Sequence, residues 1–227
     1  MSIKELNNVL EDFKKTLDAD VKSLADLHRK DGGKGQGRPG RWLEAITRAS
    51  IVLLAANLEN YIETLICEAF RYLCKNKVRA RKYPETYRLW NFRQDVNRRS
   101  LGLNDSKNVI ELSLKLWSEV RELQEDELKL EILKEEFANP TPKNVDWIMS
   151  LLDYKDYLNG ITTRVLGNDT SAKSALGEIA QRRNEIAHGD ISQTPSIDDV
   201  ERLSKFSQLF ANRIYKDVET KINECLK

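Results

Sequence analysis

The chain has 227 residues, of which 40% are hydrophobic and 32% charged, and its formal net charge is +1. This length allows one domain with a substantial core, and the density of charge excludes an integral membrane protein. The longest apolar run, residues 51–56, is far shorter than the roughly 20 residues needed to cross a bilayer. We therefore predict a soluble protein with a single helical domain over residues 1–227.

The N-terminal residues lack the apolar stretch of a signal peptide, which favours a cytoplasmic protein. Cys67, Cys74 and Cys225 are odd in number and have no close pairwise spacing, which argues against both a disulfide framework and a zinc knuckle. We expect reduced thiols that behave as small apolar side chains, and we predict no cofactor.

Apolar residues recur at steps of three and four from residue 3 to residue 29, as expected of a helix that buries one face. Residues 31–40 contain five glycines and a proline, so this helix ends there in a connector. Residues 41 to about 77 then form the predicted central helix. Within it, Glu59 interrupts a nearly uncharged stretch; a solvated position is the usual case, and the alternative is that it orients a cation of another helix.

The segment 71–99 is strongly basic, with ten basic residues against two acids. Five aromatic residues interleave with these cations, a mixture that suits single-stranded nucleic acid. The alternative, which we favour for the aromatic residues alone, is that they pack in the core while the cations are solvated. The candidate nucleic-acid-binding residues are Arg79, Arg81, Lys82, Arg88, Arg98 and Arg99.

A second long helix is predicted over residues 106–137, and the part from 119 to 136 carries eight acids against three basic residues. This acidic segment is either a solvated face or a partner of the basic segment, within one chain or across a dimer. Thr141 and Pro142 are suited to begin a further helix. Residues 153–168 are predicted to be a loop or short helices, without a β-hairpin.

Two further helices complete the prediction, one after the N-cap candidates 169–171 and one from the cap signal at 194–199 to about residue 225. The fold class is all-α, a bundle of long antiparallel helices.

The motif at residues 181–190 holds one of the two histidines of the chain. Arg183 follows Ile179 by four residues and falls on the apolar stripe, where a cation needs an anionic partner. Asn184 and His188 are also four apart, so the amide is able to orient the imidazole. A histidine at a helix end is commonly structural, and that interpretation stays open beside a catalytic one.

Residues 183–188 resemble the signature of the HEPN superfamily, in which an arginine and a polar residue precede a histidine near the end of a helix. Residues 49–61 and the pair Asn139 and Pro140 resemble the RiboL-PSP-HEPN group, and the likeness covers roughly residues 45–215. Arg182 and the basic, aromatic-rich insertion at 71–99 are less typical of the group.

This resemblance implies a metal-independent endoribonuclease, with the active site formed where two copies of the motif meet in a homodimer. We expect Arg183, Asn184 and His188 to be catalytic, with Glu59 holding Arg183 and Arg182 in a supporting role. Histidine is suited to proton transfer and arginine to the charge that develops on phosphate. The expected products are 2′,3′-cyclic phosphate and 5′-hydroxyl ends. The sequence offers no carboxylate–histidine cluster for a metal, since His28 is the other histidine.

The resemblance also implies a toxin–antitoxin or phage-defence setting, with an antitoxin or a nucleotidyltransferase as a partner and no membrane. Two alternatives remain. One is a non-catalytic HEPN module that binds a nucleotide or serves as the partner or substrate of a nucleotidyltransferase. The other is a helical interaction module in which Arg183 and His188 are structural.

Overall fold

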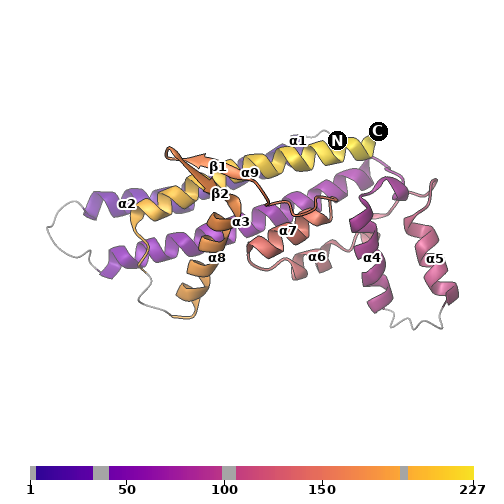
Figure 1. Ribbon diagram of the computed structural model, residues 1–227, viewed down its shortest axis with the longest axis horizontal. Helices are drawn as coiled ribbons and strands as arrows, with labels where there is room; N and C mark the ends of the chain where they lie inside the picture. The colour runs from indigo at the N-terminus through magenta and orange to yellow at the C-terminus, as the bar shows by residue number, and fades with distance from the viewer. Residues whose placement is uncertain (1–3, 33–40, 99–105, 190–193) are drawn as a thin grey trace.

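The computed structural model of the protein describes residues 4–32, 41–98, 106–189 and 194–227. The long helix α3 (Arg41–Lys75) packs against α1 (Lys4–Leu17), α2 (Ser23–Gly32) and α9 (Ile197–Leu226). Figure 1 shows these helices along the long axis, with α1 and α2 antiparallel to α3 and α9. The all-α prediction is therefore confirmed. Most of the glycine-rich connector lies outside the described residues.

The predicted first helix is present with one modification, a π-helical turn at Asp18–Lys22 (η1) between α1 and α2. Its buried stripe contains Leu10, Phe13 and Leu17 and continues to Val21 within the π turn. The turn also carries Asp20, whose Oδ2 accepts a hydrogen bond from Asn57 Nδ2 of α3 at 3.1 Å. The widened turn therefore keeps the apolar stripe in contact with α3.

The predicted central helix is confirmed as α3, which has buried residues on several faces because neighbouring helices surround it. The Tyr61 hydroxyl donates to the Ala211 carbonyl of α9 at 2.8 Å, and burial raises the pKa of this phenol far above its ordinary value. Residues 42–75 are long and apolar enough to cross a membrane, yet 56% of the most apolar stretch is buried inside the protein. This pattern is typical of the core helix of a soluble domain.

The prediction of one helix over residues 106–137 is wrong. The chain forms α5 (Ser106–Leu116), then an irregular segment with a 3₁₀ turn η3 (Glu125–Glu127), then α6 (Leu130–Glu136). Ser118 Oγ accepts from the backbone N–H groups of Val120 and Arg121, and Lys129 has a left-handed φ of 55°. These interruptions return the chain toward the core, where Leu123 and Leu133 are buried.

Helix α4 (Glu85–Arg98) follows a 3₁₀ turn, η2 (Ala80–Lys82), and packs against α5 at one end of the molecule. The next predicted helix is confirmed as α7 (Pro142–Ser150), which begins with proline at its first position. The Thr141 hydroxyl caps it by accepting from the Asn144 N–H at 3.2 Å.

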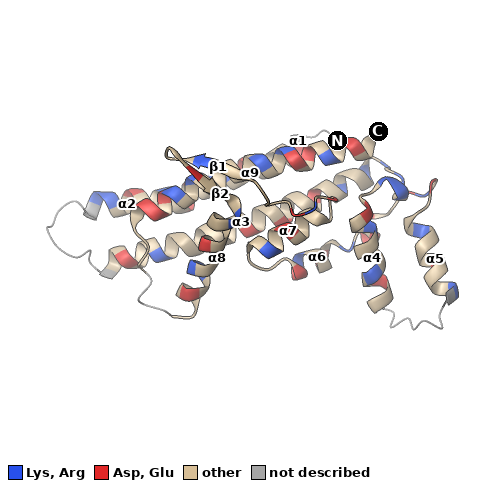
Figure 2. Cartoon of the chain, in the orientation of Figure 1, with Lys and Arg blue, Asp and Glu red and all other residues tan. Residues whose placement is uncertain are grey.

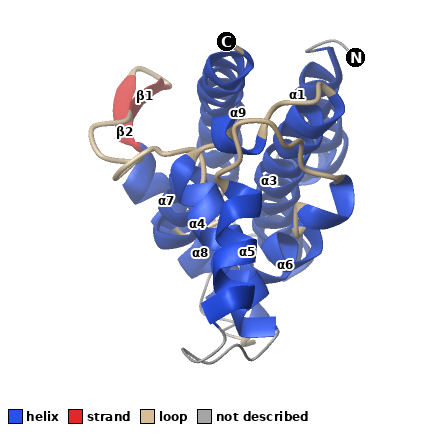
Figure 3. Cartoon of the chain, turned by 90° about the vertical axis from the view of Figure 1, so that its right-hand side faces the viewer, coloured by secondary structure: helices blue, strands red, loops and turns tan. Residues whose placement is uncertain are grey.

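The structure contains a β-hairpin, so the prediction that none is present is wrong. Thr162–Val165 (β1) and Asn168–Ser171 (β2) form an antiparallel pair beside α9 (Figure 3). Leu166 and Gly167 join them with φ of 49° and 89°, as in a two-residue type I′ turn. The hairpin leads directly into α8 (Ala172–Ala187). The cap of α9 is confirmed, since Ser196 and Asp199 exchange side-chain to backbone hydrogen bonds.

Candidate active site at the C-terminal end of α8

Helix α8 carries the motif and packs through its first half on α3, α7 and α9. The fully buried stripe ends at Ala180, and the last two turns carry half-buried and exposed side chains. His188 is the first residue beyond the helix, and its backbone N–H donates to the Asn184 carbonyl at 2.9 Å. Gly189 follows with a φ of 82°, which ends the helix in the left-handed conformation that suits glycine.

Arg183 and Asn184 form the centre of the site. Arg183 Nη1 donates to Asn184 Oδ1 at 3.1 Å, and Asn139 Nδ2 donates to the same oxygen at 3.1 Å. The structure shows no hydrogen bond between the side chains of Asn184 and His188 among the described residues, and the Asn184 amide oxygen accepts from Arg183 and Asn139 instead. The His188 side chain is exposed and has no hydrogen bond to the described residues.

Arg183 is half-buried and forms no ion pair with any carboxylate in the described part of the chain. In particular, Glu59 of α3 does not pair with it, contrary to the expectation. The pKa of the Glu63 carboxyl is raised mainly by burial, and the nearby negative charge of Glu59 raises it further. The positive charge of Arg183 is therefore left without a neutralising carboxylate from the described residues.

Arg182 belongs to an ionic network that the sequence did not reveal. Its Nε donates to Glu178 Oε1 at 3.0 Å and its Nη2 to Asp199 Oδ2 at 3.4 Å. Arg202 of α9 bonds the same two acids, with Nη2 at 2.7 Å from Glu178 Oε1 and 3.3 Å from Asp199 Oδ1. These contacts tie α8 to α9, so Arg182 stabilises the packing of the helix that carries the motif.

The basic segment does not present its aromatic side chains to solvent. Tyr72, Tyr83, Tyr87 and Trp90 are buried, and Phe92 packs against the core. This confirms the alternative in which the aromatic residues belong to the core, and it removes them as a stacking surface for bases.

Arg88 is a correction to the predicted nucleic-acid-binding set. Its side chain is only 8% exposed, its Nε donates to the Tyr83 carbonyl at 3.0 Å, and its guanidinium lies 5.2 Å from the ring centroid of Trp117. Burial lowers its pKa below the ordinary arginine value. Arg88 therefore stabilises the junction of α4 and α5 and is not placed to contact phosphate.

Arg79, Arg81 and Lys82 are exposed around η2, whereas the side chain of Arg98 and all of Arg99 lie outside the described residues. Acidic residues lie near these cations along the ribbon (Figure 2). Arg81 pairs with Glu119, and the backbones at Arg79 and Glu122 form a β-bridge. The basic and acidic segments thus pair within one chain, one of the alternatives that the sequence left open.

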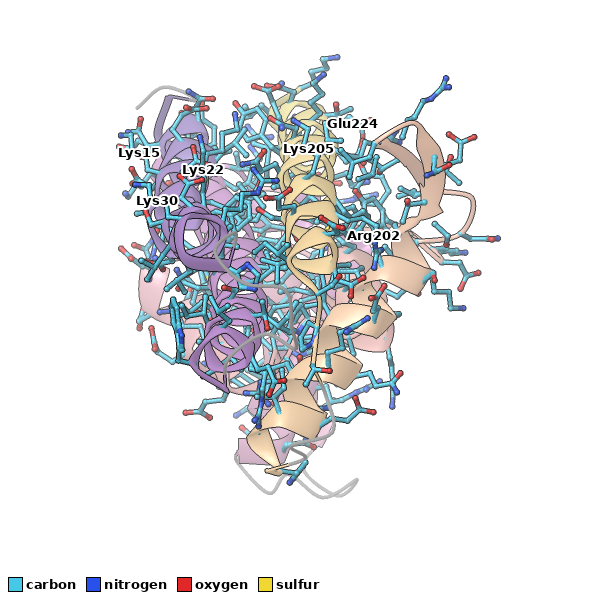
Figure 4. The ribbon with its side chains drawn as sticks, turned by 90° about the vertical axis from the view of Figure 1, so that its left-hand side faces the viewer. Lys15, Lys22, Lys30, Arg202, Lys205 and Glu224 are labelled. Atoms are coloured by element: carbon cyan, nitrogen blue, oxygen red, sulfur yellow. The ribbon has the colours of Figure 1, made fainter. Side chains whose placement is uncertain are left out.

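A groove of about 410 Å³ lies between η1, α2 and the first half of α9, lined by Lys22, Arg29, Glu201 and Lys205 among others. Figure 4 shows Arg202 on the side of α9 that faces α8 and Lys22 on the side of α1 and α2. The groove is therefore separate from the motif. Among the described residues, no three His, Cys, Asp or Glu side chains gather in a geometry that would hold a metal ion.

Comparison with known proteins agrees with the helical fold. The family model RiboL-PSP-HEPN matches residues 3–220, a range that includes the basic segment. No curated protein and no solved structure gives a match. The family match covers nearly the whole chain, and the chain therefore belongs to the RiboL-PSP-HEPN family.

Proposed function

We propose that the protein is a metal-independent endoribonuclease whose catalytic residues are Arg183, Asn184 and His188. The observation that carries this proposal is the Arg183 guanidinium, which is half-buried and lacks a carboxylate partner among the described residues. Such a group is expected to take an anionic ligand, because an uncompensated buried charge is costly. The exposed His188, one helical turn after Asn184, supplies the proton-transfer group that RNA cleavage needs.

The proposed reaction is a transesterification. His188 accepts the proton of the ribose 2′-hydroxyl, and the 2′-oxygen attacks the adjacent phosphorus. The bond from phosphorus to the 5′-oxygen breaks, and a protonated imidazole returns a proton to that oxygen. Arg183 and the Asn184 amide donate hydrogen bonds to the phosphate oxygens as negative charge builds on them. The products are a 2′,3′-cyclic phosphate and a 5′-hydroxyl end.

A homodimer with a composite site is part of the proposal, because one chain offers one histidine at this site while the reaction uses a base and an acid. A second copy, placed with its α8 end against the first, would supply the second histidine and enclose a site that is open on the monomer. The exposed surface of residues 187–189 supports this arrangement. We place the enzyme in the cytoplasm, in a toxin–antitoxin or phage-defence setting with an antitoxin as its regulator.

The test is incubation of the purified protein with total RNA in EDTA, followed by analysis of the product ends. We expect cyclic phosphate and 5′-hydroxyl ends with the wild type, and cleavage reduced about 100-fold or more with His188→Ala or Arg183→Ala. His28→Ala is the matched control, since His28 is the other histidine and lies on α2, and it should cleave normally. Activity that EDTA abolishes would exclude the metal-independent mechanism. Adenylylated tyrosine or bound nucleotide in the intact mass, without cleavage, would favour the non-catalytic alternative.

A further inference from the structure

The hydrogen bonds around Asn184 determine which atom of its amide faces the ligand. A guanidinium donates hydrogen bonds and does not accept them, so the Asn184 atom that Arg183 contacts is the oxygen. The Asn139 atom that contacts the same oxygen must then be its amide nitrogen. With the oxygen engaged twice, the Asn184 amide nitrogen is the part of the side chain left to meet a ligand.

Asn139 is held by its own loop independently of α8. Its backbone has a left-handed φ of 66°, a conformation that asparagine tolerates better than most residues. The Asn139 carbonyl accepts from the Thr141 N–H at 2.8 Å and from Asn144 Nδ2 at 3.0 Å. Because this loop precedes α7, it brings a fixed donor to the motif from a different element.

The arrangement leaves the other atom of the Asn139 amide unsatisfied. Asn139 Oδ1 is buried and has no hydrogen-bond partner among the described residues. Buried polar atoms are nearly always paired in folded proteins, and an exception calls for an explanation. An amide that served only to stabilise the loop would be expected to bond through both of its ends. Here the end that is satisfied is the one that bonds Asn184.

We propose that Asn139 is a positioning residue, which fixes the Asn184 amide with its N–H₂ group outward. The end of α8 then presents donors from both Arg183 and Asn184 and no amide acceptor. Such a surface selects an anion and rejects a ligand group that needs an acceptor. The ligand class is the phosphodiester of RNA, a point that rests on the proposed function, whereas the orientation of Asn184 is tested without catalysis.

The experiment measures binding of a 2′-O-methyl RNA oligonucleotide, which lacks the attacking hydroxyl, in EDTA. Asn139→Gly suits the left-handed backbone and removes the amide. We expect it to weaken binding about three- to tenfold, the size of one lost hydrogen bond. Asn139→Asp, which cannot donate and adds a negative charge beside Arg183, should weaken binding further. Thr141→Ala is the control for loop stability, because it removes the α7 cap and leaves the Asn139 side chain in place.

A double-mutant cycle separates positioning from a direct contact. In the Asn184→Ala background, Asn139→Gly should cause no further loss of binding, because its effect passes through Asn184. An equal loss of affinity from Asn139→Gly in the wild type and in Asn184→Ala would overturn the proposal. So would an Asn139→Gly variant that binds with wild-type affinity, or a wild type that does not bind the probe. The proposal would also be overturned if Thr141→Ala lost as much affinity for the probe as Asn139→Gly and the two variants had the same melting temperature. A wild type that binds the probe with this pattern but cleaves no RNA refutes the proposed function and leaves the role of Asn139 intact.

Discussion

Arg182 and Arg183 are adjacent in the sequence but have opposite surroundings. Arg182 is bound by Glu178 and Asp199, which tie α8 to α9. Arg183 bonds the neutral amide of Asn184 and has no carboxylate partner among the described residues. One arginine thus serves the fold, and the charge of the other remains available to a ligand.

Exchanging each of these arginines for alanine should separate stability from activity. Arg182→Ala is expected to lower the free energy of unfolding by about 0.5–1 kcal/mol, because Arg202 still pairs with both acids. Arg183→Ala should reduce RNA cleavage about 100-fold or more with little change in stability. Denaturant unfolding and cleavage rates measure the two effects. The reverse pattern would assign the ligand-binding role to Arg182.

The same network predicts a dependence of stability on pH. Burial would raise the pKa of Asp199, but hydrogen bonds from Ser196 and the charges of Arg182 and Arg202 outweigh it and hold this pKa below its ordinary value. A lowered pKa in the folded state contributes stability that is complete above the unfolded pKa of about 4 and is lost as the pH falls below it. Asp199→Asn should therefore cost about 1 kcal/mol at pH 7.

Unfolding free energies measured at pH 7 and pH 3 test whether the stabilisation by Asp199 is lost as the pH falls. The difference between the wild type and Asp199→Asn should shrink at the lower pH, where the wild-type carboxylate becomes protonated. A difference that stays constant between these two pH values would show that the charge of Asp199 does not stabilise the folded state.

The exposed and buried cations of the basic segment should differ in their effect on RNA binding. If Arg79 and Lys82 each neutralise one phosphate, Arg79→Gln and Lys82→Gln should each reduce the slope of log affinity against log salt by about 0.7. Arg88→Ala should leave that slope unchanged. It should instead lower the unfolding free energy by about 1–3 kcal/mol, since the Tyr83 carbonyl loses its donor. Unaltered slopes for Arg79→Gln and Lys82→Gln would exclude this surface from RNA binding.

The hairpin turn offers a stabilising substitution. Leu166 has a φ of 49° and is 71% exposed, so it occupies a left-handed position with little packing to lose. Asparagine before glycine is the preferred sequence of a type I′ turn. Leu166→Asn should raise the free energy of unfolding by about 0.5–1 kcal/mol, measured by chemical denaturation. A loss of stability would mean that the leucine makes a contact that outweighs its backbone cost.

The long helices were predictable from sequence because their apolar stripes are continuous and their ends carry local signals. Thr141 before Pro142 and the Ser196 cap mark the beginnings of α7 and α9 as expected. The break after α5 was missed because the signal is tertiary. Leu123 and Leu133 lie in the core only if the chain turns at Ser118 and Lys129, and neither residue is a strong helix breaker.

The candidate site was predictable as a set of residues but not as a set of contacts. Helical spacing correctly placed Arg183 and Asn184 on the end of α8, yet spacing within one helix cannot reveal a partner from another element. Asn139 reaches Asn184 from the loop before α7, across 45 residues of sequence. Helical spacing predicted a contact between Asn184 and His188, whereas the hydrogen bond that the structure shows joins Asn184 to Asn139 of another element.

Helix α3 extends along the molecule, with α8 against its middle and the α4 and α5 pair beyond its C-terminal end (Figure 1). Substitutions at these two places share few neighbours, so their free-energy effects should combine additively. Substitutions in the motif and at the exposed cations around η2 should therefore affect the free energy of unfolding independently. On the proposed function, changes around η2 would then alter RNA affinity and leave the rate of the chemical step at the end of α8 unchanged.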